Sequence, residues 1–500
     1  MGRGLFRLGC THGKPGERGQ LHRRLIDERG LAGEQFDEPI PQWPGLRQQL
    51  TWVVDGYTLA LACLVLPAGA LGDRFGRRVV LIIGMAIFTL ASAIPLLIGG
   101  PLWLIGARAA AGVGAAFVMP STLSLLTAGF PDERRGQAVG VWAGVAGSGG
   151  ALGIIGSGVL LQWLSWQSVF VAMTAVGAIL LAAGCTVSES IAAQRPPLDP
   201  WGSMGVATAV GLIVVAAMEV PTRGWVDPLV LGLLAGGLVA TAAFVLVELR
   251  VTHPLLDVRL FADRGFASGT LSLAVQFLVS FGLFMLVVQY LQLILGYSPL
   301  ASSLALGPMI VPLILVSLVA PWLADRFGLR WVTLIGLATV GIGLLAIARL
   351  NLSSGYWGVL WSLLIMSTGM GLCTAPATAA IVAGTPVEKH GVAAAVNDAA
   401  REIGAALGIA VAGNVLAAGY SQRIAPALPR LPESARGPVG DSLAAALQVA
   451  ERGGPQAQPL ADFAKTAFLH GFQQAGVALG CAALVAAVLI AAWAPGIARR

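Results

Sequence analysis

The chain is organised as long runs of apolar residues separated by short islands of charge. One run, from Val79 to Gly99, contains 21 residues, none of them charged. An α-helix rises 1.5 Å per residue, so this run would be about 30 Å long, which is the hydrocarbon thickness of a bilayer. The pattern predicts a membrane-spanning helix.

Thirteen runs of this kind predict an all-α polytopic membrane protein. A transmembrane β-barrel would show segments of about ten residues with alternating polarity, a pattern that this sequence lacks. The predicted spans are residues 51–72, 79–99, 102–127, 137–161, 167–187, 203–220, 226–247, 266–295, 300–323, 331–349, 356–383, 391–418 and 466–493. The Pro- and Ala-rich segment 419–465 is predicted to be an extracytoplasmic loop with at most one short helix.

The composition agrees with a membrane location. The chain is 56% hydrophobic and 11% charged, whereas a soluble domain has about 25% charged residues. Most of the Lys and Arg residues between predicted spans lie on the side of the Asp73–Arg78 loop, which predicts that this side is cytoplasmic. The net charge of +6 is therefore assigned to Arg-rich loops of a multi-pass cell-membrane protein, and we expect no nucleic-acid partner.

The residues that usually carry enzyme chemistry are dispersed. Five Cys and five His residues occur without CxxC or HExxH spacing, so the sequence supports no disulfide and no metal site. No GxxxxGK[ST] motif for ATP is present. We expect no cofactor and no enzymatic activity.

A short repeat divides the chain into two halves. "DRFG" occurs at Asp73–Gly76 and again at Asp325–Gly328, each time between two apolar spans on the same predicted side. Matching loops in matching positions indicate two homologous halves, a common transporter architecture.

The repeat also predicts that one helix is missing. In the second half the span 266–295 precedes the pair that flanks the loop, whereas residues 1–50 contain eight Lys/Arg and six Asp/Glu and no long apolar run. We interpret them as a polar, disordered or aberrant start that replaces a lost first span, the alternative being an extracytoplasmic tail. The predicted organisation is this segment, a helix bundle at 51–187, a linker with two inserted helices at 188–250 and a second bundle at 251–495.

Several stretches resemble motifs of the major facilitator superfamily, specifically of its 14-span drug:proton antiporter branch. "GALGDRFGRR" resembles the loop motif, with Gly69, Asp73, Arg74, Gly76, Arg77 and Arg78 in place, and "LIGARAAAGVGAA" resembles the fourth-helix motif, with Arg108 and Gly112. "MEVPTRGW" resembles the link between the two helices inserted in this branch. The resemblance implies a major facilitator fold of two six-helix-type halves with two inserted helices, and a monomer that exchanges a small molecule for protons.

The fifth-helix antiporter motif is altered. "GGALGIIGSGVL" keeps Gly149, Gly153 and Gly158, but Ile154 and Ser157 stand where proline and glycine are usual in the family. Gly149, Gly153 and Gly158, together with the glycines at 140, 144, 147, 150 and 156, are expected to let helix 137–161 pack closely on its neighbours. Gly112 is expected to do the same for the span 102–127. Because this motif is linked to exchange, its alteration weakens the inference of antiport.

The charged loop is interpreted as a conformational latch. Asp73 can accept hydrogen bonds from arginines or from a helix N-terminus, and Gly72 and Gly76 permit tight turns and close helix approach. Alternatively, Arg74, Arg77 and Arg78 serve only to fix the orientation of the chain in the membrane. The second copy contains Asp325, Arg326 and Gly328, but only one arginine, Arg330, follows it where the first copy has the pair Arg77 and Arg78. This second loop is therefore expected to be structural.

Two further groups within the spans are candidates for a proton or substrate relay. Asp55 is an isolated carboxylate in the first predicted helix. It is either a functional group, which is the default interpretation of a carboxylate inside a membrane helix, or a hydrated group at the membrane interface. Arg108 requires a partner inside its helix, either Asp55 or a chain of water, or serves as a fixed tie between helices.

The stretch "NDAAREIG" is the richest polar segment within a span. Asp398 and Glu402 are four residues apart and share a helix face, and Arg401 is three residues from Asp398. Their depth favours a relay that faces the interior. The alternative is an Asp398–Arg401 pair that locks the second half.

Together these features predict proton-coupled efflux of small amphipathic or cationic compounds by alternating access, as in multidrug and antibiotic resistance. Two alternatives are a dedicated exporter of one metabolite or antibiotic, and a degenerate membrane protein that transports nothing.

Overall fold

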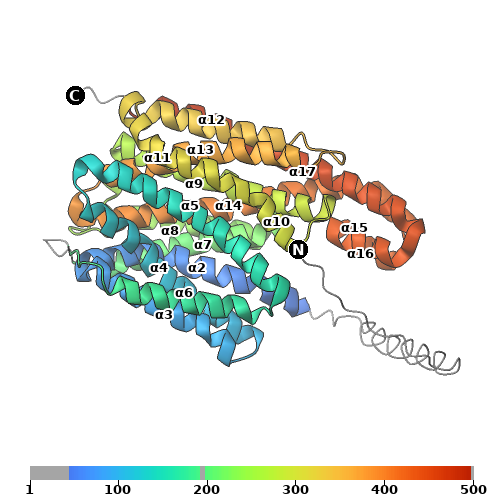
Figure 1. The fold of residues 1–500 in the computed structure, drawn as a ribbon, viewed down its shortest axis with the longest axis horizontal. Helices are drawn as coiled ribbons and strands as arrows, with labels where there is room; N and C mark the ends of the chain where they lie inside the picture. The colour runs from blue at the N-terminus through green and yellow to red at the C-terminus, as the bar shows by residue number, and fades with distance from the viewer. Residues whose placement is uncertain (1–43, 192–196, 497–500) are drawn as a thin grey trace, which may run out of the picture. The chain divides into compact units, whose positions relative to one another are not determined.

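The structure, a computed structural model, describes residues 44–191 and 197–496 of the 500-residue chain. All regular secondary structure in those two ranges is helical (Figure 1). Residues 53–500 form one compact unit, to which the following description applies. The predicted polar start falls largely outside the described residues, and residues 44–50 belong to the first described helix.

The first half consists of five long helices with short connections. They are α2 (Pro44–Phe75), α3 (Arg77–Leu97), α4 (Pro101–Gly129), α5 (Asp132–Trp163) and α6 (Gln167–Gly184). Helix α3 packs against both α4 and α6.

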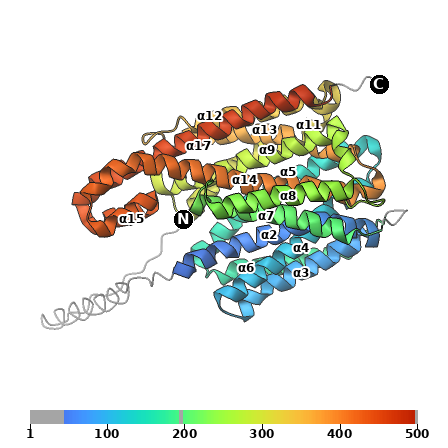
Figure 2. The same ribbon diagram turned by 180° about the vertical axis from the view of Figure 1, so that it is seen from behind.

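The two inserted helices, α7 (Pro200–Arg223) and α8 (Pro228–Glu248), begin in the same way. In each, an Asp precedes a Pro, and the Asp carboxylate accepts a hydrogen bond from a backbone N–H of the first turn. Asp at the N-cap followed by Pro at the first helical position is a strong start signal. The two helices lie side by side, as Figure 2 shows from behind, and α7 also packs on α14.

The second half contains six membrane-length helical segments, some of them interrupted. Its elements are η1 (Val258–Ala262), α9 (Arg264–Gln289), η2 (Tyr290–Ile294), α10 (Pro299–Leu306), η3 (Gly307–Met309), α11 (Ile310–Phe327), α12 (Leu329–Ile347), α13 (Tyr356–Ala383), η4 (Val387–Lys389), α14 (His390–Ile424) and α17 (Gln458–Trp493). Helix α9 lies in the middle of this group and packs against α12, α13, α14 and α17.

The segment between α14 and α17 is more ordered than the sequence suggested. It contains η5 (Ala425–Arg430), α15 (Glu433–Asp441), α16 (Leu443–Gly453) and η6 (Gly454–Ala457), so the expectation of at most one short helix is wrong. Helix α16 begins at an N-capping Ser442 and buries Leu443, Ala446 and Ala450 on one face. This helical spacing of apolar residues explains why it forms.

The two halves meet along pairs of helices. Helix α5 of the first half packs against α11 and α13, and α14 of the second half packs against α4. Thus α14 contacts the first half, the inserted pair and α9.

The prediction of thirteen spans is confirmed: the described part of the chain has 13 helices that are long and apolar enough to cross a membrane. The two "DRFG" copies also have the same backbone form. Gly76 (φ 111°) and Gly328 (φ 87°) each separate two helices in a conformation that only glycine adopts readily. The repeat in sequence is therefore a repeat in structure.

We predict that Gly76→Ala lowers the free energy of unfolding by about 1–3 kcal/mol, the cost of forcing a side chain into this backbone region. An added Cβ would also lie 2.8 Å from the Glu189 carboxyl carbon. Thermal unfolding of the purified protein in detergent measures the change. Gly99→Ala is the control, because a Cβ there meets no atom within 4 Å, and equal losses in the two variants would contradict the prediction.

Candidate functional site

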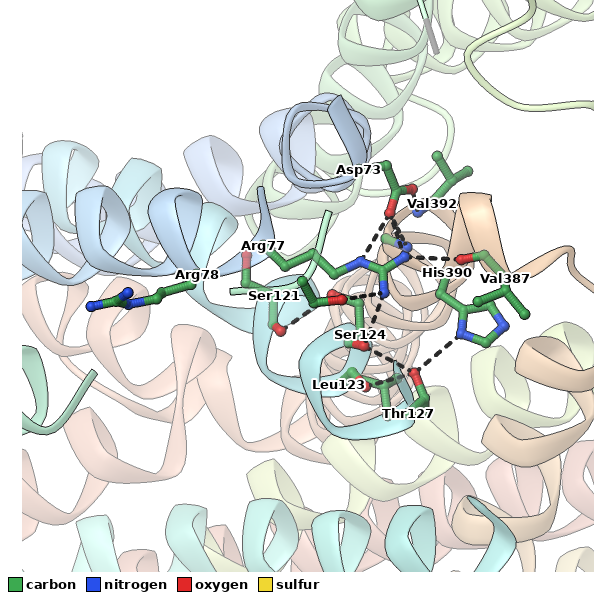
Figure 3. A network of polar contacts seen from close by, with 12 residues as sticks. Asp73, Arg77, Arg78, Ser121, Leu123, Ser124, Thr127, Val387, His390 and Val392 are labelled. Carbon is green, nitrogen blue, oxygen red and sulfur yellow. Dashed lines mark hydrogen bonds and ion pairs between the residues drawn. The ribbon is translucent and has the colours of Figure 1, made fainter. Parts of the chain in front are cut away.

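A buried ion pair lies at the end of α2 and the start of α3 (Figure 3). Asp73 is fully buried and Arg77 is 2% exposed. The Arg77 guanidinium donates two hydrogen bonds to Asp73 Oδ1, from Nη2 at 2.9 Å and from Nε at 3.1 Å. Charges buried at this depth are stable only when they are paired and hydrogen-bonded.

Arg77 Nη1 also donates to the Ser124 carbonyl oxygen and to Ser190 Oγ, each at 3.4 Å, and the second half of the chain supplies further partners of the pair from η4 and α14. Asp73 accepts hydrogen bonds from the backbone N–H groups of Gly391 at 2.9 Å and Val392 at 3.1 Å. These N–H groups belong to the first turn of α14, where they have no partner within the helix and where the helix dipole favours an anion. Arg77 Nη2 also donates to the Val387 carbonyl oxygen at 3.0 Å. The ion pair therefore joins the two halves.

Helices α2 and α14 approach each other very closely beside this ion pair. A Cβ on Gly69 would collide with the Gly391 carbonyl oxygen, and a Cβ on Gly391 would collide with Gly69. Glycine at both positions lets α14 present its N-terminus to Asp73. We call Asp73, Arg77 and the first turn of α14 the latch.

The neighbouring arginines have different surroundings. Arg78 points away from the latch in Figure 3 and donates to the Cys185 carbonyl oxygen, while its own backbone N–H donates to Glu189. Arg74 is half-buried with its guanidinium near the Phe75 ring.

The second copy of the motif is not buried in this way. Asp325, Arg326 and Arg330 are at least partly exposed, and Arg326 lies near the rings of Trp322 and Phe327. Gly328 has the same backbone conformation as Gly76, but the charged side chains of the second copy are exposed. The two copies therefore share a backbone conformation and differ in their surroundings.

A second polar cluster lies along α14, two turns beyond the latch. Asp398 is fully buried and Arg401 is 9% exposed. Arg401 Nη1 lies 3.4 Å from Asp398 Oδ1, which also accepts a hydrogen bond from the Asn397 amide at 3.1 Å. Asp398 Oδ2 and Arg401 Nε are buried without a hydrogen-bond partner among the described residues. The pair is therefore only partly satisfied.

The Arg401 guanidinium is held between two aromatic rings. It lies 5.4 Å from the ring centroid of Trp142 on α5 and 4.5 Å from that of Phe277 on α9. Cation–π attraction is strongest where water is excluded. Because α5 belongs to the first half and α9 to the second, Arg401 contacts both.

Glu402 follows Asp398 by one turn and is half-buried. Its carboxylate forms no hydrogen bond or ion pair with the described residues, and it lies within electrostatic range of the Tyr57 hydroxyl on α2. The structure thus brings Asp398, Arg401 and Glu402 together on α14.

The proposed pairing of Arg108 with Asp55 is wrong. The Arg108 guanidinium lies 4.4 Å from the Tyr57 ring centroid and donates to the Val53 carbonyl oxygen at 3.3 Å. Val53 and Tyr57 are four residues apart and share a face of α2, whereas Asp55 lies two residues from each and cannot share that face. Asp55 instead lies within electrostatic range of Glu219 on α7.

The packing expected of the glycines holds at two of the four candidate positions. A Cβ on Gly112 would collide with the Tyr57 carbonyl oxygen, and one on Gly158 would lie 3.1 Å from Ser303 Oγ. At Gly149 and Gly153 a Cβ would meet no atom within 4 Å, so close packing there is a wrong expectation.

Gly149 and Gly153 have no close neighbours because they line a cavity. Its volume is about 660 Å³ and its walls come from α2 to α6, largely from apolar side chains such as Phe88 and Met173. By the loop repeat, α3 to α6 correspond to α12, α13, α14 and α17, the helices on which α9 packs. The cavity thus lies where a counterpart of α9 would pack.

Sequence reasoning missed three contributors to these sites. They are Trp142, Phe277 and His390, whose Nδ1 lies 3.4 Å from Thr127 Oγ1 beside the latch. A buried arginine in a membrane span could have prompted a search for aromatic partners, but nothing in the sequence says which rings meet it.

Comparisons with known proteins agree with this architecture. The family model of the Major Facilitator Superfamily matches residues 45–409. Multidrug resistance protein Stp of Mycobacterium tuberculosis is 33% identical over 76% of this chain and 71% of its own length. Methyl viologen resistance protein SmvA of Salmonella typhimurium is 33% identical over 88% of this chain and 89% of its own length.

A solved structure extends the likeness to the fold. The human organic anion transporter MFSD10 (TETRAN) superposes with a TM-score of 0.58 at 13% identity, covering 95% of this chain and 92% of its own. The predicted family and fold class are confirmed.

We predict that Asp73→Asn destabilises the protein by about 3–5 kcal/mol, because it leaves the buried Arg77 charge without its counter-ion. Asp325→Asn, at the same place in the second copy, should change stability by less than about 0.5 kcal/mol. Thermal unfolding in detergent compares the two. Similar shifts in both variants would show that the buried pair has no special role.

Proposed function

The chain belongs to the major facilitator superfamily, and we propose that it exports small amphipathic, mainly cationic compounds in exchange for protons. Membership makes it a multi-pass membrane transporter for small molecules and not an enzyme. The coupling ion, the class of substrate and the residues that carry them are what we propose.

The observation that carries the proposal is the burial of Asp398 beside Arg401. A carboxylate inside a membrane helix costs about 2.5–3.5 kcal/mol on insertion scales and is functional by default. Here its partner is the neighbouring Arg401, and one carboxylate oxygen has no partner among the described residues. Such a group is suited to bind and release a proton.

Proton binding at Asp398 changes a contact between the halves. When Asp398 is charged, it attracts the Arg401 guanidinium along α14. When Asp398 takes up a proton, that attraction weakens and the guanidinium is left with Trp142 and Phe277, which belong to different halves. The strength of the contact across the interface therefore depends on the proton.

Glu402 is the carboxylate proposed to meet the substrate. It forms no ion pair with the described residues and lies within electrostatic range of Tyr57 on α2. An ammonium or pyridinium group and a proton would compete for the same negative charge, which makes exchange the natural outcome. The name of the relative SmvA refers to methyl viologen, a dication, and this supports the substrate class.

The latch connects this chemistry to the cytoplasmic end. Asp73 binds the first turn of α14, and Asp398 lies seven residues after Gly391, about 10 Å along the same helix. A shift of α14 that follows a change at Asp398 would move the N–H groups away from Asp73. Opening of the latch and occupancy of the relay are thereby linked by one helix.

We predict that cells expressing the protein pump out ethidium, that an uncoupler abolishes this efflux, and that Asp398→Asn and Glu402→Gln each reduce it to near the level of cells without the protein. The reason is that neither amide can take up a proton. Efflux is followed by the loss of ethidium fluorescence from energised cells.

Glu451→Gln, an exposed carboxylate on α16, is the control and should retain efflux. If both α14 variants keep uncoupler-sensitive efflux, the relay is misplaced. Absence of efflux by well-inserted wild-type protein, for methyl viologen as well as ethidium, would oppose the proposed substrate class.

A further inference from the structure

Two acidic residues outside the proposed relay meet at one end of the inserted helix pair. Asp199 precedes α7 and Glu248 is the last residue of α8, so the antiparallel packing of these helices brings the two together. Asp199 is 7% exposed and Glu248 is 2% exposed. Two carboxyl groups are thus removed from water at the same place.

Each carboxyl group has one oxygen that is satisfied by the backbone. Asp199 Oδ1 accepts a hydrogen bond from the Gly202 N–H at 2.8 Å, as the N-cap of α7. Glu248 Oε2 accepts one from the Leu256 N–H at 3.1 Å. These two hydrogen bonds fix the orientation of both groups.

The other two oxygens lie near each other, and neither has a hydrogen-bond donor among the described residues. Asp199 Oδ2 and Glu248 Oε1 are buried and have no hydrogen-bond partner among the described residues. A Cβ placed on Gly202 would lie 2.7 Å from Asp199 Oδ2 and would collide with Glu248 Oε1. Both oxygens lie within 2.7 Å of this Cβ position, so the distance between the two oxygens is less than twice 2.7 Å.

Two ionised carboxylates in this arrangement would repel each other where little solvent screens them. Lys389 and Arg259 are cations near this site, and neither forms an ion pair with either acid among the described residues. Lys389 of η4 acts on Glu248 from a distance, and Arg259 Nη2 donates to the carbonyl oxygen of Leu249, the residue after Glu248, at 3.3 Å. A shared proton would remove the repulsion and supply the missing donor.

We propose that Asp199 and Glu248 bind one proton between them, in an O–H···O hydrogen bond that joins the start of α7 to the end of α8. A metal ion fits this site poorly, since no group of three or more His, Cys, Asp or Glu side chains suited to a metal occurs in the described ranges and hard cations require more oxygen ligands. Gly202 leaves the space in which the two oxygens meet.

The proposal predicts a specific dependence of stability on pH. A proton bound by the folded state and not by the unfolded chain stabilises the fold while it is bound, and the stabilisation is lost as the pH rises past its release. The side-chain amide introduced by Glu248→Gln or by Asp199→Asn can donate to the remaining carboxylate without a shared proton. Each substitution should therefore preserve the contact and remove this part of the pH dependence.

The experiment measures thermal unfolding of the full-length protein in detergent from mildly acidic to mildly alkaline pH. We expect the wild-type midpoint to fall more steeply with rising pH than the midpoint of either variant. Asp227→Asn is the matched control, because Asp227 caps α8 as Asp199 caps α7 and accepts from the Leu229 N–H at 2.9 Å. It should keep the wild-type pH dependence.

Infrared spectroscopy provides an independent reading at neutral pH. The carbonyl band of a protonated carboxylic acid should be weaker in both Glu248→Gln and Asp199→Asn than in the wild type, and unchanged in Asp227→Asn. Wild-type pH dependence and an undiminished band in both variants would overturn the proposal. A wild-type midpoint that rises with added Mg²⁺ or Ca²⁺, when neither variant responds, would overturn it in favour of a metal site.

Discussion

The buried Asp73 carboxylate organises one end of this protein, because it joins three separate segments. It pairs with Arg77 at the start of α3, lies at the end of α2 and accepts two N–H groups from α14. A charged group that is buried away from water needs such partners to be stable. The close approach of Gly69 to Gly391 and the position of α14 against the first half both serve this one requirement.

The same requirement recurs along α14 with a different outcome. At the latch the carboxylate is fully satisfied, whereas at Asp398 one oxygen is left without a described partner and Arg401 depends on aromatic rings. In the mechanism that we propose, the fully paired group holds the halves together until α14 shifts, and the partly paired group is the one that responds to a proton.

The sequence predicted most of the fold and less of the sites. Spans were predictable because a bilayer imposes a length on apolar runs, and the "DRFG" repeat marked the two halves. Helix α16 was missed because its apolar face is short, although Ser442 followed by Leu443, Ala446 and Ala450 has helical spacing. Asp55 was one of the partners considered for Arg108 because both are charged, whereas the helical phase of α2 presents Val53 and Tyr57. Contacts between side chains of different helices, such as those of Arg401 with Trp142 and of Asp199 with Glu248, have no signal in a single sequence.

Only the first of the two repeated loops has a buried ion pair that is bound to the other half of the chain, so any conformational change that separates the halves at this end has to break the contacts of Asp73 with α14. A ligand can shift the balance between two conformations only through the difference between its affinities for them. A compound that binds one form much more tightly than the other shifts the protein toward that form and holds it there. For this transporter, tight binding and effective transport are therefore separate properties, and a strong preference for one form is a property of an inhibitor.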